Sequence, residues 1–361
     1  MNSKKVNWIF LSIVLLHFAL VAVITVLGLK YGYTLGIVPN FLVSQGILLA
    51  PALLWTFFSG ENLFRLVGLN RIKVSTVFKI CLFTFLAMPL TTLINMISML
   101  FVDNTVAAIS GDVLDAPFLV MLFIIGIFGP FSEELVFRGI VYQGYRKSGT
   151  VFYAMLLSAL LFALMHMNFN QAAYAFVIGV MVALLVEATG SLWSSVIFHM
   201  VFNSQQVCLM YLYDAVSFGE NELEQAQEML TKDVLLIMIS LWLMFAAAAT
   251  ALAACALVWI AKGEGRGDAL KSVWRDRKKQ VMPQAVQTAY GMPETAGMYG
   301  MAGSGQGNAA EACQWPEAAG EKKENAKTGR MVTVPLIIGI VLALSYMSLE
   351  LILEHLLFSV F

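Results

Sequence analysis

Charged side chains are scarce in this sequence. Aspartate, glutamate, lysine and arginine make up 12% of its 361 residues, against about 25% in ordinary soluble domains. Hydrophobic residues make up 59%, and the mean hydropathy is +0.78. A soluble fold could not bury so much apolar surface, so we expect an integral membrane protein surrounded by lipids. The net charge of −1 gives no basic surplus for phosphates, which argues against a nucleic-acid partner.

Several common functional motifs are also missing. The four cysteines are scattered, with neither CxxC spacing nor a disulfide framework; they are Cys81, Cys208, Cys255 and Cys313. There is no HExxH, which excludes a zincin-like metal site, and no Walker A motif. No serine–histidine pair indicates a rhomboid-like serine protease. Any chemistry must therefore come from other polar residues.

Long apolar stretches dominate the chain, and most approach the roughly 20 residues that a helix needs to cross a bilayer. They predict an all-α fold, a polytopic transmembrane helical bundle of about eight or nine spans. The first stretch follows the basic start MNSKK but is too long for a signal peptide and lacks a cleavage site, so we expect a retained helix. The stretches lie near 6–29, 36–58, 78–102, 117–142, 151–167, 171–188, 191–213, 233–261 and 331–361.

The basic residues between the spans predict the topology. Most of them fall on one side of a nine-span arrangement, in the N-terminus, around 65–79, at 146–147 and in 262–330. The alternate loops, 103–116 and 213–233, hold one lysine between them. Since basic loops stay in the cytoplasm, the N-terminus is expected inside and the C-terminus outside. The short loops and the absence of eukaryotic sorting signals favour a bacterial plasma membrane.

The composition divides the chain into five parts. We expect N-terminal transmembrane helices over 1–110, a core with polar motifs over 111–213, an additional transmembrane helix over 214–261 and a C-terminal one over 331–361. Residues 262–330 are rich in Gly, Ala, Met and Gln without apolar periodicity. Such a segment cannot bury enough surface to offset the entropy of ordering, so a flexible cytoplasmic loop is predicted.

Charges inside the fourth span are the most informative feature. The segment FSEELVFR places Glu133, Glu134 and Arg138 in an apolar helix, where each charge costs about 2.5–3.5 kcal/mol at the bilayer centre. Glu134 and Arg138 are four residues apart, so they share a helix face and can pair. Glu133 points about 100° away and needs a partner from another helix. Gly129-Pro130 should kink or interrupt the helix and free backbone groups nearby.

Two further polar clusters follow on later spans. His166 ends the segment FALMH, and His199 and Asn203 share a helix face in HMVFN. Together with Glu133 these residues can converge on one cavity. That set could activate a water molecule and stabilise an oxyanion. Alternatively, Glu133, His166 and His199 could hold a zinc ion.

In order and spacing, EELVFR, FALMH and HMVFN match EExxxR, FxxxH and HxxxN. They resemble the motifs of the CPBP intramembrane proteases, also called the CAAX-protease and bacteriocin-processing or Abi family. The resemblance covers roughly residues 115–210. It implies a CAAX-type intramembrane endopeptidase, a hydrolase that cuts a peptide or membrane-protein substrate.

The resemblance also implies roles for the motif residues. Glu133, together with His166, would activate the attacking water, and His199 and Asn203 would hold the oxyanion. Glu134 and Arg138 would support the first motif helix. Members of the family are named metalloproteases, but a metal-free glutamate mechanism is also proposed, so both alternatives stay open.

Two other functions remain open at this point: a non-catalytic immunity factor or scaffold of the same fold, and a transporter with a proton-relay glutamate. The predicted boundaries also contain a conflict. They place His166 near the outer end of its span, whereas His199 lies about 12 Å from the cytoplasmic face at 1.5 Å per residue. The two histidines must share a depth if they act together.

Overall fold

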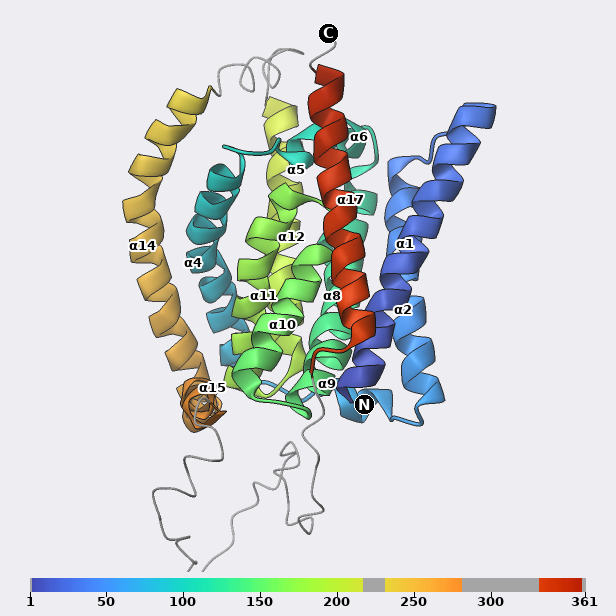
Figure 1. Cartoon of the computed structure of the whole chain (residues 1–361). Helices are drawn as coiled ribbons and strands as arrows, with labels where there is room; N and C mark the ends of the chain where they lie inside the picture. Colours follow the sequence, from blue (N-terminus) through green and yellow to red (C-terminus); the bar gives the residue numbers. More distant parts are fainter. Residues whose placement is uncertain (1, 217–230, 281–330, 359–361) are drawn as a thin grey trace, which may run out of the picture.

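The computed structural model describes residues 2–216, 231–280 and 331–358, and every regular element in these ranges is a helix. The protein is a polytopic transmembrane helical bundle, as predicted (Figure 1). Seven of the described helical segments are long and apolar enough to cross a membrane. They are α1 (Ser3–Tyr31), α2 (Ile37–Phe58), α4 (Val74–Ser98), the composite helix Phe118–Arg146, α11 (Phe169–Thr189), α14 (Lys232–Gly263) and Val334–Leu353 within α17 (Val334–Phe358).

Two further helices complete the nine predicted segments. The apolar helix α10 (Val151–Leu164) has 14 residues, or about 21 Å at 1.5 Å per residue, less than the roughly 30 Å of a bilayer core. Helix α12 (Leu192–Val216) is 25 residues long but more polar. Short helices α3 (Leu63–Val67), α5 (Thr105–Ala108) and α6 (Ser110–Leu114) lie in connections.

The two ends of the bundle differ in charge. In Figure 1 the N-terminus, α9 (Gln143–Arg146) and α15 (Gly267–Gln280) lie at one end, and α5 and α6 lie at the other. We call the first the basic end, because Lys4, Arg146 and Lys271 lie there. The predicted grouping of basic residues is thus present in the fold. The assignment of the basic end to the cytoplasm stays a prediction.

The composite helix Phe118–Arg146 is continuous but contains two π-helical segments between its α-helical parts. It runs through α7 (Phe118–Met121), the π-helix η1 (Leu122–Phe128), α8 (Gly129–Glu134), the π-helix η2 (Leu135–Tyr142) and α9. The chain stays helical through Gly129-Pro130. Proline lacks a backbone N–H, and π-type turns, which form hydrogen bonds between residues i and i+5, accommodate its absence. Single π-turns are frequent at functional sites. The first motif lies between the two π segments.

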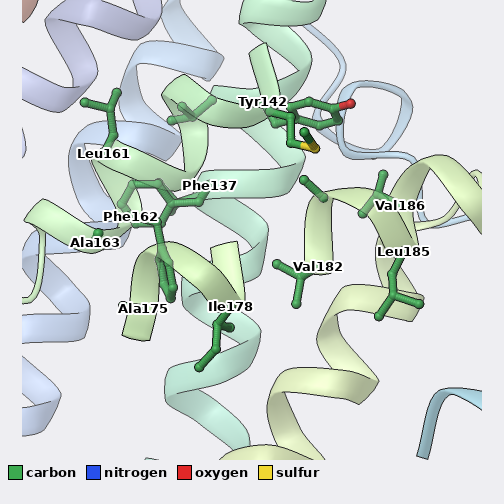
Figure 2. Packing of buried hydrophobic residues seen from close by; sticks show 14 of the residues in the cluster. Phe137, Tyr142, Leu161, Phe162, Ala163, Ala175, Ile178, Val182, Leu185 and Val186 are labelled. Carbon is green, nitrogen blue, oxygen red and sulfur yellow. The ribbon is translucent and has the colours of Figure 1, made fainter. Parts of the chain in front are cut away.

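Helices α10 and α11 form a tightly packed pair that contacts this composite helix. Thr150 caps α10 by accepting from the Tyr153 N–H, and Asn168 caps α11 by accepting from the Gln171 N–H. A Cβ on Gly179 would lie 2.8 Å from the Cβ of Ala159, so only glycine permits this approach. Figure 2 shows the resulting apolar core, in which Phe137 and Phe162 meet edge to face.

The prediction of a flexible loop over 262–330 is wrong for the first part of that segment. Residues Gly267–Gln280 form α15, which buries Leu270 and Val273 against the bundle and brings Trp274 to Phe152. These apolar residues recur three or four positions apart, as in an amphipathic helix. The remainder of that loop, 281–330, and residues 359–361 of the predicted C-terminal helix lie outside the described residues, as do residues 217–230 of the predicted 214–261 segment.

Candidate active site

A cavity of about 440 Å³ lies among α2, α4, η1, α8, α11 and α12. Glu133, His166, His199 and Asn203, which the sequence predicts to converge, all line it. They come from α8, from the turn after α10 and from α12. The volume is within the range of about 300–1,000 Å³ typical of small-molecule sites.

Glu134 and Arg138 form the predicted pair, and the structure adds a third partner. Arg138 Nη1 donates to Glu134 Oε1 at 3.1 Å, and both side chains are completely buried. His199 Nδ1 lies 2.9 Å from the same carboxylate oxygen. The Arg138 guanidinium also lies over the ring of Phe162, 4.2 Å from its centroid. Glu134 therefore orients His199 as well as neutralising Arg138.

Glu133 finds its partner on another helix, as its position required. Its Oε2 lies 3.8 Å from His199 Nε2. With Nδ1–H donating to Glu134, the second ring nitrogen of His199 faces Glu133 and the cavity. The Glu133 side chain is 20% exposed, whereas that of Glu134 is fully buried. Adjacent glutamates thus have different surroundings: one carboxylate lies in the cavity, and the other lies behind it.

His166 and His199 lie at the same depth, which removes the conflict in the predicted boundaries. Helix α10 ends at Leu164, short of a full crossing, so the turn that carries His166 lies within the bundle. Phe162 contacts both imidazoles edge to face, with centroids 5.0 Å from His166 and 5.8 Å from His199. His166 Nδ1 lies 3.1 Å from the Phe162 carbonyl oxygen, which leaves Nε2 as the free nitrogen. The following residue, Met167, has a φ of 51°, a conformation that is uncommon outside glycine.

Asn203 joins α12 to the composite helix through the backbone groups that Pro130 leaves free. Proline has no N–H to donate to the carbonyl four or five residues earlier. Asn203 Nδ2 donates to the carbonyl of Ile125 at 3.1 Å, and Ser204 Oγ donates to that of Gly126 at 3.2 Å. The prediction that Gly129-Pro130 frees backbone groups is confirmed. One N–H of the Asn203 amide is used here, and the other is available to the cavity.

Sequence reasoning missed two polar residues. Gln45 of α2 lines the cavity, is 8% exposed, and its Oε1 has no hydrogen-bond partner among the described residues. It lies outside the three motifs, so only the fold reveals it. Glu187 of α11 lies at the basic end, where it accepts from the Tyr142 hydroxyl at 2.8 Å and pairs with Arg146 at 3.0 Å. A lone glutamate at the end of an apolar span was the only signal for it.

The three residues named as zinc ligands are not arranged as a metal site. Among the described residues, no group of three or more His, Cys, Asp or Glu side chains is placed to hold a metal ion. The Nδ1 atoms of His199 and His166 contact Glu134 and a carbonyl, which leaves both Nε2 atoms free, as in many metal-binding histidines. As they lie in the structure, however, Glu133, His166 and His199 are not grouped as the ligands of a zinc ion.

Comparisons with known proteins agree with this reading of the motifs. Residues 115–205 match the family described as Type II CAAX prenyl endopeptidase Rce1-like, which confirms the resemblance predicted from the three motifs. A Bacillus subtilis (strain 168) protein named "Putative membrane peptidase YdiL" is 28% identical over 125 residues. These residues are 35% of this chain, and the chain spans about half the length of that relative. No solved structure matches.

Proposed function

We propose that the protein is an intramembrane endopeptidase in which Glu133 activates a water molecule for attack on a peptide bond. The observation that carries this proposal is the convergence of Glu133, His166, His199 and Asn203 on one cavity. Matches to a peptidase family and to a protein named as a membrane peptidase support the general activity. The mechanism and the substrate belong to the proposal.

In the proposed reaction, the water oxygen bonds to the scissile carbonyl carbon while Glu133 accepts a water proton. His166 Nε2 can accept a hydrogen bond from the same water, because Nδ1–H is directed at the Phe162 carbonyl. The carbonyl oxygen becomes an oxyanion, which the free N–H of Asn203 and the imidazole of His199 would stabilise. The C–N bond then breaks, and Glu133 returns its proton to the leaving amine.

The direct test is cleavage of a quenched fluorescent peptide library by the purified protein in detergent. Glu133→Gln keeps the shape and removes the base, so the rate should fall about 10²- to 10⁴-fold. Asp268→Asn is the matched control, since this carboxylate is 96% exposed on α15 and forms an ion pair with Lys271. Its rate should equal that of the parent.

The same assay separates the alternatives. Full activity of Glu133→Gln would refute the proposed base. Loss of activity with a zinc chelator, restored by added zinc, would replace the metal-free mechanism with a metal-dependent one. A folded parent protein that cleaves no peptide would favour the immunity-factor or scaffold function.

A further inference from the structure

The cavity has a closed end and an open end along α12. His199 is 3% exposed, and Phe198 and Val196, closer to the basic end, are fully buried. In the opposite direction the cavity lining continues from Asn203 to Met210, which is about 16 Å beyond His199 at 1.5 Å per residue. Gln206, on this stretch, is exposed.

The composite helix closes the same end. Ten consecutive residues, 136–145, are buried, so no described path leads from the site along this helix to the basic end. The opposite end of the cavity is lined by residues of the α5–α6 segment, including Asn104 and Val113. Asp112, on that segment, is acidic and exposed. The opening therefore faces away from the basic end.

Neutral amides line much of the cavity. None of the described lining residues is lysine or arginine. Six lining residues carry a carboxamide: Gln45, Asn95, Asn104, Gln171, Asn203 and Gln206. A carboxamide offers both donors and an acceptor, the same pair of functions that a peptide unit requires. A terminal carboxylate is typically bound by an arginine or a lysine, and neither lines the cavity.

A peptide substrate must be extended at the bond that is cleaved. Its backbone N–H and C=O groups then lack the hydrogen-bond partners that they would have in a helix. Inside a membrane each unsatisfied N–H or C=O costs several kcal/mol, so the cavity has to supply replacements. Gln45 is suited to this, since its buried Oε1 lacks a partner among the described residues. A Cβ on Gly129 would lie 3.6 Å from Gln45 Nε2 and 3.9 Å from Glu133 Oε1, so the amide and the base flank the same point.

We propose that the substrate is an extended peptide segment presented at the membrane face opposite the basic end, bound through its backbone by neutral amides and not through a terminal carboxylate. This inference rests on the proposed endopeptidase function and specifies its substrate class. With the basic end in the cytoplasm, the substrate is an exported segment or the outer part of a membrane anchor.

The test uses a membrane-impermeant quenched peptide with right-side-out and inverted vesicles from a bacterial host. Asp112→Cys and Lys271→Cys, labelled with an impermeant maleimide, report which face is outside. Cleavage is expected only where position 112 is accessible. Cleavage only where position 271 is accessible would overturn the inference. Absence of cleavage even in detergent would instead refute the proposed function and the inference with it.

Two further arms test recognition in detergent. The same peptide with a free or an amidated C-terminus should be cleaved at similar rates, whereas a carboxylate-binding cation would give a preference of about 10- to 100-fold for the free acid. Gln45→Leu should raise KM about 3- to 10-fold with kcat little changed. A strong preference for the free acid, or an unchanged KM in a folded Gln45→Leu variant, would contradict recognition through amides.

Discussion

The two ends of the membrane bundle are built differently. At the basic end, 136–145 are buried and Glu187 ties Tyr142 and Arg146 together. At the other end, apolar and carboxamide side chains line most of a cavity that continues to the exposed Gln206. On the proposed function, we expect the packed half to hold the site rigid and the hollow half to receive the substrate. Stability and activity should therefore respond to substitutions in different halves.

The boundary between the halves passes between two adjacent residues. Glu134 is fully buried, with Arg138 and His199 as partners, whereas Glu133 reaches the cavity. A helix turns about 100° per residue, so neighbours in the sequence face different surroundings. This arrangement lets one carboxylate position His199 while the other stays accessible for chemistry.

Arg138→Met should produce the largest loss of stability. It removes the cation and leaves Glu134 buried without its ion pair, which costs about 3–5 kcal/mol in comparable buried pairs. Unfolding in mixed detergent micelles measures the effect. Lys271→Met, at a side chain 79% exposed, is the control and should change stability by less than about 0.5 kcal/mol. Equal effects for the two variants would contradict a rigid, ion-paired half.

Gly126→Ala should destabilise the contact between the halves by about 1–3 kcal/mol, as overpacking does. An added Cβ would lie 2.6 Å from Ser204 Oγ and 3.2 Å from its Cα, so α12 must move away from η1. Ser204→Gly in the same chain removes the closer clash and should restore part of the loss. Gly111→Ala is the control, because nothing lies within 4 Å of its Cβ position. The same midpoint of thermal unfolding for both alanine variants would refute the close contact.

Tyr142→Phe should cost about 1.5 kcal/mol, because it removes a buried hydrogen bond to the Glu187 carboxylate. Thr92→Ala, at an exposed position in the hollow half, should stay within about 0.5 kcal/mol of the parent. Chemical unfolding of both variants measures this difference in the free energy of unfolding between the packed half and the hollow half. A larger loss for Thr92→Ala than for Tyr142→Phe would reverse it.

Much of the site could be predicted because its signals are local. The pairing of Glu134 with Arg138 follows from their spacing, and the freed carbonyls near Gly129-Pro130 follow from the chemistry of proline. The three motifs also indicated that Glu133, His166, His199 and Asn203 line one cavity. The helix α15 was missed because its apolar residues are few and lie in a strongly polar segment.

The amino-acid sequence by itself determined the membrane bundle and its candidate catalytic residues, because hydropathy, helix spacing and missing N–H groups act within a few residues of each other. Only the tertiary structure decided that Glu134 holds His199, that Gln45 joins the cavity, and that Glu187 meets Arg146. These contacts join helices that are distant in the chain, and the packing of those helices sets their distances. Packing also made one end of the bundle solid and left the other end hollow.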